Sequence, residues 1–308
     1  IAHLSSIKAS LPFIHFFDGF RTSHEINKIQ EIDLAKIEKL IDKEALKDFR
    51  MRALNNKNPN TRGTAQNDDI YFQNTEVRNR NYDDAITVVE TYMNKINKIA
   101  KTDYSLFNYY GDPNATDVIV AMGSVCSCIE EVVSVLNTKG YRVGLIKVHL
   151  FRPFSSKPLL NCVSKTVKNI AVLDRTKEPG SSGEPLYLEV VNTFKMSNVT
   201  IIGGRYGLSS KNTTPAMIKA VFDNFREAKK NNFTIGINDD VTNLSLDFDP
   251  HFKLDNNNYE LLLYGYGSDG MVSTSKDLIR IIGDYTSKYV QGYFQYDSKK
   301  SGGVTKSH

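Results

Sequence analysis

The sequence predicts an α/β protein in which a parallel-sheet domain is flanked by the end of one α/β domain and by the start of a βαβ domain. Between positions 115 and 250, short apolar runs alternate with segments of helical periodicity and with short loops. This alternation is typical of parallel strands joined by helices that cover both faces of the sheet. Near the C-terminus, a G-x-G-x-x-G spacing lies between a strand-like run and a helical pattern, which is the order of a phosphate-binding βαβ unit.

Length and composition leave room for two domains and part of a third. The chain has 308 residues, of which 40% are hydrophobic and 24% are charged, as in ordinary globular proteins. The net charge of +4 is spread without a basic run, so nucleic acid is not expected as a partner. No apolar segment has the length of a membrane helix, so no membrane partner is expected either. Because the chain begins with Ile1 and stops soon after the second strand of its last unit, we expect it to be a piece of a longer polypeptide.

The cysteines do not predict a metal site. Cys126, Cys128 and Cys162 form no C-x-x-C pair, and no histidine stands at metal-ligand spacing from them. We therefore expect reduced, buried thiols, and no iron–sulfur cluster or zinc site in this part of the protein.

The first 31 residues resemble the end of an α/β domain in their pattern. The run Leu11–Phe17 predicts a strand that ends at Asp18-Gly19. Thr22 and Glu25 match a capping box, so a helix or a turn is predicted there. Four polar side chains follow the predicted strand, where α/β proteins bind ligands, although a satisfied loop network is an equally good interpretation. They are His15, Asp18, Arg21 and His24.

Two helices are predicted before the parallel sheet. Charges of alternating sign indicate an exposed helix over 32–54, and apolar spacing indicates an amphipathic helix over 81–101 that leads into a polar tether. Residues 55–77 between them are predicted to be irregular. Within that loop, three residues can contact a neighbouring domain or an anionic ligand, or can form hydrogen bonds inside the loop: Arg62, Thr64 and Gln66.

The parallel sheet is predicted element by element. Strands are expected at 117–121, 142–151, 170–174, 200–203 and 233–237, and helices from 125 to 138, at 157–167, at 186–195 and from 213 to 230. Pro215 fits the first turn of the last helix.

The loops that follow these strands are expected to meet at one edge of the sheet, because parallel strands share their carboxyl edge. They include Met122–Ser124, Arg175–Glu184 and Gly204–Ser210, and they bring Arg175 and Arg205 to that edge. One interpretation is a small-molecule site; the other is a face that docks other domains. We prefer the docking face, because no nucleophile with a partner base is present at this edge.

The C-terminal unit predicts a phosphate site. A buried strand is expected at Tyr259–Tyr264, a glycine loop follows, and a second strand is expected at Tyr289–Tyr296. The glycines permit a tight turn, and the helix after them favours an anion at its N-terminus. Lys299 and Lys300 follow the acid Asp297, which favours coenzyme A or NADP over NAD. A Rossmann-type dehydrogenase and a ligand-free structural turn remain as alternatives.

Six segments together resemble signatures of the pyruvate:ferredoxin (flavodoxin) oxidoreductase family. Their order follows the order of the family, and they cover nearly the whole chain. The segments are 12–25 (PFIHFFDGFRTSHE), 62–67 (RGTAQN), 173–180 (LDRTKEPG), 204–211 (GRYGLSSK), 233–242 (FTIGINDDVT) and 297–305 (DSKKSGGVT). A relative fused to a flavin-containing NADPH domain, pyruvate:NADP⁺ oxidoreductase, has the same appearance over these residues.

The resemblance implies a division of the chain. Residues 1–112 look like the C-terminal part of a pyrimidine-binding domain for thiamine diphosphate plus a helical linker. Residues 113–250 look like a transketolase C-terminal-like domain. Residues 258–308 look like the start of a coenzyme A-associated βαβ domain.

The resemblance also implies an activity for the full-length parent. The family decarboxylates pyruvate oxidatively to acetyl-coenzyme A with thiamine diphosphate, Mg²⁺, [4Fe–4S] clusters and coenzyme A, none of which is expected to bind fully to this piece. It implies contacts with the remaining domains of the parent, a homodimer, and ferredoxin, flavodoxin or a fused NADPH–flavin domain as electron acceptor. A cytoplasmic location is expected, or a hydrogenosome-like organelle in a protist.

For this chain the resemblance implies no catalytic residue and a set of coenzyme A-binding candidates. The candidates are Gly265, Gly267, Ser268, Asp269, Gly270, Lys299 and Lys300. Asp18, Arg21, Arg62, Thr64, Gln66, Arg175 and Arg205 are expected on inter-domain or substrate-facing surfaces. The sequence departs from the family's usual glycine loop at Met271 and at Ser273–Ser275, while Lys276 is kept.

Overall fold

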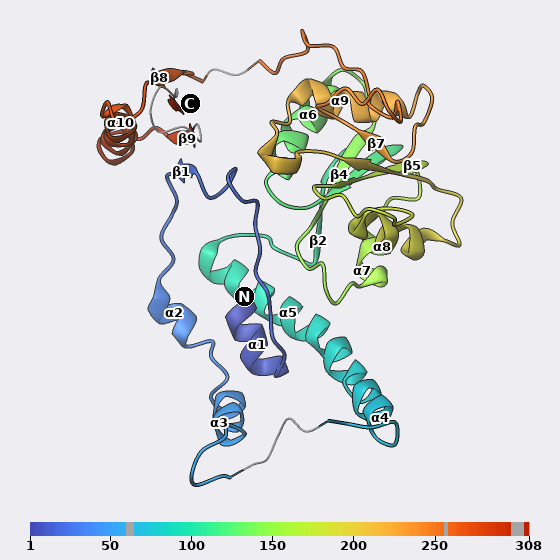
Figure 1. The fold of residues 1–308 in the computed structure, drawn as a ribbon, viewed down its shortest axis with the longest axis vertical. Helices are drawn as coiled ribbons and strands as arrows, with labels where there is room; N and C mark the ends of the chain where they lie inside the picture. The colour runs from blue at the N-terminus through green and yellow to red at the C-terminus, as the bar shows by residue number, and fades with distance from the viewer. Residues whose placement is uncertain (60–64, 256–257, 297–304, 308) are drawn as a thin grey trace.

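The structure, a computed structural model, describes residues 1–59, 65–255, 258–296 and 305–307. Figure 1 shows a group of N-terminal helices, a central α/β sheet with its covering helices, and a small C-terminal α/β unit beside it. No helix in the described ranges is long and apolar enough to cross a membrane.

The central sheet has six strands in the order β2-β4-β3-β5-β6-β7. Five of them are parallel, as predicted: β3 (Asp117–Ala121), β4 (Val143–Val148), β5 (Asn169–Asp174), β6 (Thr200–Arg205) and β7 (Phe233–Thr234). The sixth, β2 (Phe107–Gly111), pairs antiparallel with β4 and was expected to be a polar tether. An edge strand buries only part of its surface, so its sequence carries fewer apolar residues than a central strand.

Helices cover both faces of this sheet, which explains why its strands are nearly all apolar. Ile119 of β3 packs into a cluster with α6 (Val125–Thr138) and α9 (Pro215–Asn224) on one face. Val118, its neighbour, packs on the other face with α5 (Asn79–Ala100), α7 (Ser156–Cys162) and α8 (Pro185–Phe194). Successive strand residues point to opposite faces, so β3, β4 and β5 each contribute to both clusters.

The N-terminal region differs from the prediction in three places. The helix expected over 32–54 is two helices, α2 (Leu34–Glu38) and α3 (Lys43–Met51), because Asp33 and Asp42 each accept a backbone N–H and start a separate helix. The run Leu11–Phe17 is not a strand: it follows α1 (Ala2–Ala9) as a segment without a strand assignment. The region expected to be irregular, 55–77, contains α4 (Tyr71–Glu76).

The C-terminal unit contains the predicted strand–helix–strand order, but the two strands are not neighbours. They are β8 (Leu263–Gly265) and β9 (Gln291–Gln295), joined by α10 (Met271–Tyr285). The strand β10 (Thr305–Ser307) lies between them, antiparallel to both, and β1 (Glu25–Asn27) pairs antiparallel with the other side of β9.

One further local prediction differs from the structure, and at a second position the structure decides between two alternatives. The buried strand expected at Tyr259–Tyr264 is wrong, because only its last two residues enter β8 and Tyr259 is 93% exposed. Of the helix or turn predicted from the capping pattern at Thr22 and Glu25, the structure has the turn, which leads into β1. Aromatic and aliphatic runs fit a strand only where another element covers them.

Gly204 in β6 offers a test of the packing across the sheet. Its neighbour in the ladder is Phe233 of β7, and a Cβ at position 204 would overlap the Phe233 ring, which is fully buried. We expect Gly204→Ala to lower the free energy of unfolding by about 1–3 kcal/mol, as overpacking of a core does. Urea unfolding measures this, with Gly19→Ala as control, because a Cβ there meets nothing within 4 Å. Equal stability of both variants would contradict the packing described.

Candidate functional site

At the carboxyl edge of the central sheet lies the point where the order of the strands reverses. From β3 the chain passes to β4 on one side, and β5 then lies on the other side of β3. In open α/β sheets the crevice at such a point is where ligands bind. A cavity of about 1090 Å³ opens at this point, between the segment 13–20 and the sheet edge, and is lined by Met122, Arg175 and Tyr206 among others.

The side chain of Asp18 enters this crevice. One carboxylate oxygen accepts the Ser124 N–H at 2.7 Å, and the other lies 2.7 Å from the Arg175 guanidinium. Gly123, with φ of 83°, permits the approach, because a Cβ there would stand 2.9 Å from the carboxylate. The Asp18 and Arg175 side chains are only 11% and 17% exposed. The structure therefore brings together two residues that the sequence placed on the same surface, and adds Gly123 and Ser124.

The electrostatics of Asp18 favour its ionised form. Burial alone would raise the pKa of this carboxyl, but the hydrogen bonds from Ser124 and the positive charge of Arg175 outweigh burial and lower the pKa. Arg175 is held in turn by its Nε, which donates to the Gly207 carbonyl at 2.9 Å. A carboxylate from the chain itself thus occupies the anion-binding end of α6, and this supports the docking interpretation of the edge.

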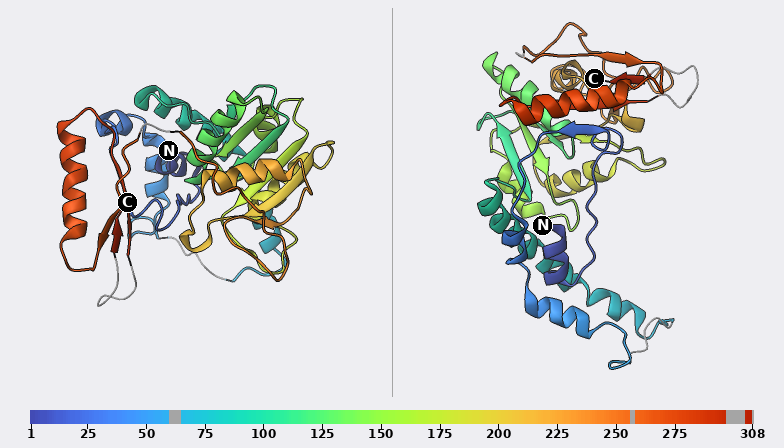
Figure 2. Two further views of the ribbon diagram at one scale, coloured as in Figure 1. Left: turned by 90° about the horizontal axis from the view of Figure 1, so that it is seen from above. Right: turned by 90° about the vertical axis from the view of Figure 1, so that its left-hand side faces the viewer.

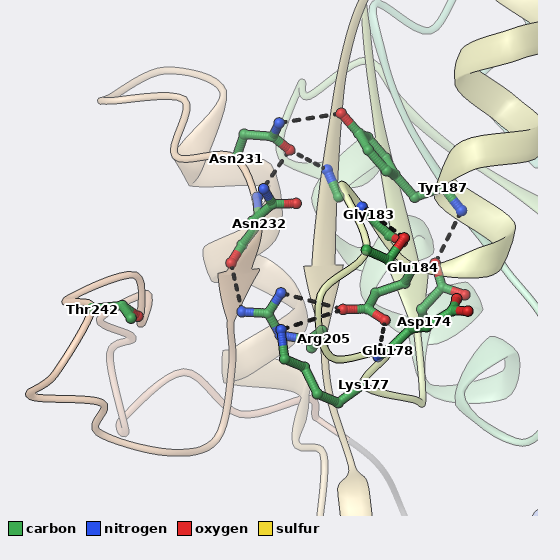
Figure 3. Close-up of polar contacts among 12 residues, drawn as sticks. Asp174, Lys177, Glu178, Gly183, Glu184, Tyr187, Arg205, Asn231, Asn232 and Thr242 are labelled. Carbon is green, nitrogen blue, oxygen red and sulfur yellow. Dashed lines mark hydrogen bonds and ion pairs between the residues drawn. The ribbon is translucent and has the colours of Figure 1, made fainter.

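Glu184 organises the second charged group at this edge (Figure 3). Its side chain is 5% exposed and accepts the Glu178 N–H at 2.6 Å. Its other oxygen lies 3.4 Å from the Arg205 guanidinium and 4.0 Å from the Lys177 ammonium. Arg205 also donates to the Asn232 carbonyl at 2.9 Å. Arg205 is therefore satisfied within the sheet module, and Glu184, which the sequence analysis did not single out, is its main partner.

Asp174 ends β5 and fixes the start of α8. Its two carboxylate oxygens accept the N–H groups of Leu186 and Tyr187, both at 3.0 Å. The residue is 3% exposed, and burial raises the pKa of its carboxyl to about 6, with a further contribution from the nearby Glu184.

This raised pKa has a consequence for stability. The folded protein holds the Asp174 proton more tightly than the unfolded chain does, so the stability that this group contributes falls as the pH rises from about 4 to about 6. A shift of about two pKa units corresponds to roughly 3 kcal/mol. Urea unfolding between pH 4 and 7 tests this: Asp174→Asn is expected to remove the decline in that window. A variant with the same pH dependence as the original protein would contradict it.

Arg21 and His24 of the N-terminal segment have partners away from Asp18. Arg21 contacts the Asn212 side chain, and its guanidinium lies 4.7 Å from the centre of the Tyr293 ring. His24 packs edge-on against Tyr296, and the His15 ring lies 5.9 Å from that of Phe17. Of the four residues predicted to form a polar cluster, His15 and Asp18 line the same cavity, whereas Arg21 and His24 contact the residues named above. Gln66 is exposed, whereas Arg62 and Thr64 lie outside the described residues.

The glycine loop before α10 adopts the conformation that its sequence predicts. Gly267 and Gly270 have φ of 83° and 82°, and Ser268 is also left-handed at 54°. Asp269 accepts the Tyr266 N–H at 2.7 Å and the Met271 N–H at 3.1 Å, and these hydrogen bonds lower the pKa of its carboxyl. The negative charge of Asp269 therefore lies among loop amides that the sequence analysis assigned to a phosphate. Lys299 and Lys300 lie outside the described residues.

The described residues do not fit a metal ion or an iron–sulfur cluster. Burial raises the pKa of the Cys126 and Cys128 thiols to about 12. Within the described ranges, no group of three or more His, Cys, Asp or Glu side chains is arranged to hold a metal ion.

Three family models match the chain in sequence order. Residues 1–94 match "Pyruvate flavodoxin/ferredoxin oxidoreductase, thiamine diP-bdg". Residues 115–218 match "Pyruvate:ferredoxin oxidoreductase core domain II", and residues 260–308 match "Pyruvate ferredoxin/flavodoxin oxidoreductase".

Curated relatives match over the whole chain. The pyruvate:ferredoxin oxidoreductase of Moorella thermoacetica is 52% identical over 100% of this chain and 27% of its own length. The pyruvate-flavodoxin oxidoreductase of Enterobacter agglomerans is 51% identical, with the same coverage. The chain thus spans about a quarter of these relatives. A 2-oxoglutarate:ferredoxin oxidoreductase structure from Magnetococcus marinus covers 56% of this chain and 28% of its own, at 17% identity and a TM-score of 0.34, too low to support a conclusion.

Proposed function

Because the chain belongs to the pyruvate ferredoxin/flavodoxin oxidoreductase family, we propose that it serves in a protein that converts pyruvate and coenzyme A to acetyl-coenzyme A and carbon dioxide. The two electrons released would pass singly to ferredoxin or flavodoxin through iron–sulfur clusters. The observation that carries this proposal is the ordered match of three family models, together with 52% identity over the full chain.

Within that protein, this chain would act as a scaffold that joins three domains. The proposed division is 1–112, 113–250 and 258–308. Thiamine diphosphate would supply the chemistry that cleaves the bond between the keto carbon and the carboxylate of pyruvate. We assign no ligand of Mg²⁺ or of an iron–sulfur cluster to the described residues, since their His, Cys, Asp and Glu side chains form no group of three or more that could hold a metal ion. Its contribution would be positional: Asp18 with Arg175, and Glu184 with Arg205, fix the edge of the central sheet.

The glycine loop is the part of this chain that we assign to coenzyme A. The left-handed backbone at Gly267, Ser268 and Gly270 and the N-terminus of the fifteen-residue helix α10 suit a phosphate group. Lys299 and Lys300 would supply positive charge to it. Asp269 would not be a phosphate ligand, since a carboxylate in that position opposes an anion; it would shape the loop.

The activity is tested on the full-length protein that contains this chain. We expect reduction of ferredoxin or flavodoxin that requires both pyruvate and coenzyme A, and no reduction with 2-oxoglutarate in place of pyruvate. Reduction of NADP⁺ without an added carrier would identify the fused variant. Activity that does not depend on coenzyme A would overturn the proposal.

The coenzyme A assignment has a test of its own. Lys299→Ala with Lys300→Ala is expected to raise the KM for coenzyme A about tenfold or more, since a hydrogen bond to a charged group contributes about 1.5–3 kcal/mol. The KM for pyruvate is expected to stay unchanged. Lys288→Ala is the matched control, because this lysine lies beyond the far end of α10, over the Tyr259 ring. Equal KM values for coenzyme A in all three proteins would place the cofactor elsewhere.

A further inference from the structure

The segment 18–28, which we call the strap, connects the central sheet to the C-terminal unit. In Figures 1 and 2 it runs from the neighbourhood of the central sheet to the four-stranded sheet, where β1 forms an edge strand. The unit that it reaches, residues 259–307, includes the glycine loop and α10. Within the described residues, none of the three apolar clusters contains a residue after Leu254, so the C-terminal unit has no place in those cores.

The first end of the strap is anchored at the carboxyl edge of the central sheet. Asp18 binds the Ser124 N–H and the Arg175 guanidinium, each at 2.7 Å. Ser210, in the loop after β6, donates its hydroxyl to the Gly19 carbonyl at 3.2 Å. Three loops of one sheet edge therefore hold this end.

The second end is anchored on β9 and on the C-terminus of α10. Residues Glu25–Asn27 pair with Gln291–Tyr293, and the Phe294 N–H donates to the His24 carbonyl at 3.3 Å. The ammonium of Lys28 donates to the Gly283 carbonyl at 2.6 Å and to the Thr286 carbonyl at 3.3 Å. A cation at this end of a helix satisfies carbonyls that have no partner inside the helix, and it complements the helix dipole.

Arg21 lies between the two anchors and contacts both sides. Its guanidinium hydrogen-bonds the side chain of Asn212, which belongs to the central module, and lies 4.7 Å from the centre of the Tyr293 ring of β9. His24 continues this contact, because its ring packs edge-on against both Phe20 and Tyr296, at 5.1 and 5.7 Å. Movement at either anchor therefore displaces the Arg21 side chain, which is also in contact with the other anchor.

We propose that the strap is a coupling element: docking of Asp18 at the central sheet and pairing of β1 with β9 stabilise each other, and Arg21 transmits the effect. The position of the glycine loop relative to the central sheet edge then depends on Asp18, although Asp18 contacts neither the loop nor α10. This inference concerns the mechanics of the chain and holds whether or not the protein acts on pyruvate.

The test measures the rate of hydrogen–deuterium exchange in the full-length protein. A peptide containing Ser124 reports on the anchor at the central sheet, and a peptide containing Phe294 reports on the anchor at β9. Asp18→Asn is expected to speed exchange at Phe294 by about fivefold or more, the lower end of typical coupling between sites. Lys28→Met, which removes the charge at the other end, is expected to speed exchange at Ser124 in turn, because coupling is reciprocal. In an Arg21→Ala background, both distant effects are expected to disappear.

The controls separate coupling from general unfolding. Unchanged exchange at Val118–Val120, in the centre of β3, shows that the central sheet stays folded. Arg52→Ala removes a surface contact to Ser10 and is expected to change neither anchor. If Asp18→Asn speeds exchange only at Ser124 and Lys28→Met only at Phe294, the two anchors are independent and the proposal is wrong. If Asp18→Asn unfolds the sheet, Lys28→Met decides the question alone.

Discussion

Replacement of Arg175 by methionine is expected to lower the free energy of unfolding by about 3–5 kcal/mol, the cost of breaking a buried ion pair by removal of one partner. The side chains of Asp18 and Arg175 are 11% and 17% exposed and lie 2.7 Å apart, so solvent screens their interaction weakly. The variant leaves the Asp18 carboxylate in the crevice without its cation, and it leaves the Gly207 carbonyl without the N–H that it accepts at 2.9 Å. Methionine keeps most of the side-chain volume, which separates loss of charge from loss of packing.

A double-mutant cycle isolates the pair. Asp18→Asn combined with Arg175→Met is expected to be more stable than the sum of the single changes predicts, because no unpaired charge remains. Additive effects would show that the pair contributes no coupling energy. As a matched control, Arg80→Met removes an exposed pair with Asp84 at 3.9 Å and is expected to cost at most a few tenths of a kcal/mol.

The pH dependence of this pair has the opposite sign to that of Asp174. The pKa of Asp18 is lower in the folded protein than in the unfolded chain, so the carboxylate stabilises the fold above about pH 4. That stability is lost as the pH falls through the folded-state pKa, below about pH 4. Asp18→Asn is therefore expected to reduce the fall in the free energy of unfolding below pH 4. Asp174→Asn is expected to change its pH dependence only above about pH 4.

The positions of the central strands follow from local sequence, because a strand covered on both faces must be apolar throughout. Asp117–Ala121 and Asn169–Asp174 show this pattern, and both were located to within one residue. The strands that sequence analysis missed, β1, β2 and β10, are edge or short antiparallel strands with mixed polarity. At Tyr259–Tyr264 the sequence has the apolar pattern, but the described structure leaves Tyr259 and Leu261 exposed.

The residues that lie at the carboxyl edge could be predicted from the sequence, but their partners could not. Arg175 and Arg205 were placed at the carboxyl edge because they follow parallel strands, and the structure has them there. The partner of Arg175 is Asp18, which also accepts the N–H of Ser124, a residue 106 positions later in the chain. No local sequence pattern predicts a contact between residues so far apart. Glu184 stands directly before Pro185 at the start of α8, and an acid directly before a proline at a predicted helix start is the sequence signal that was available for it.

Replacement of Glu184 by alanine is expected to cost about 3–5 kcal/mol, the other large effect at this edge. The side chains of Glu184 and Arg205 are 5% and 13% exposed, and Arg205 would keep its contact with the Asn232 carbonyl but lose its charged partner. The Glu178 N–H, which Glu184 accepts at 2.6 Å, would also lose its acceptor, and the loop 175–184 would lose its fixed form.

Glu184→Gln separates charge from shape at the same position. Glutamine keeps an oxygen for the Glu178 N–H but cannot neutralise Arg205, so an intermediate loss of about 1–3 kcal/mol is expected. Glu178→Ala is the matched control, since its side chain is exposed and only its backbone N–H takes part. Equal unfolding free energies for Glu184→Ala and Glu178→Ala, measured in urea at pH 7, would contradict the assignment. A loss in Glu184→Gln as large as in Glu184→Ala would mean that charge alone holds the loop, and that Lys177, at 4.0 Å from Glu184, shares the role of Arg205.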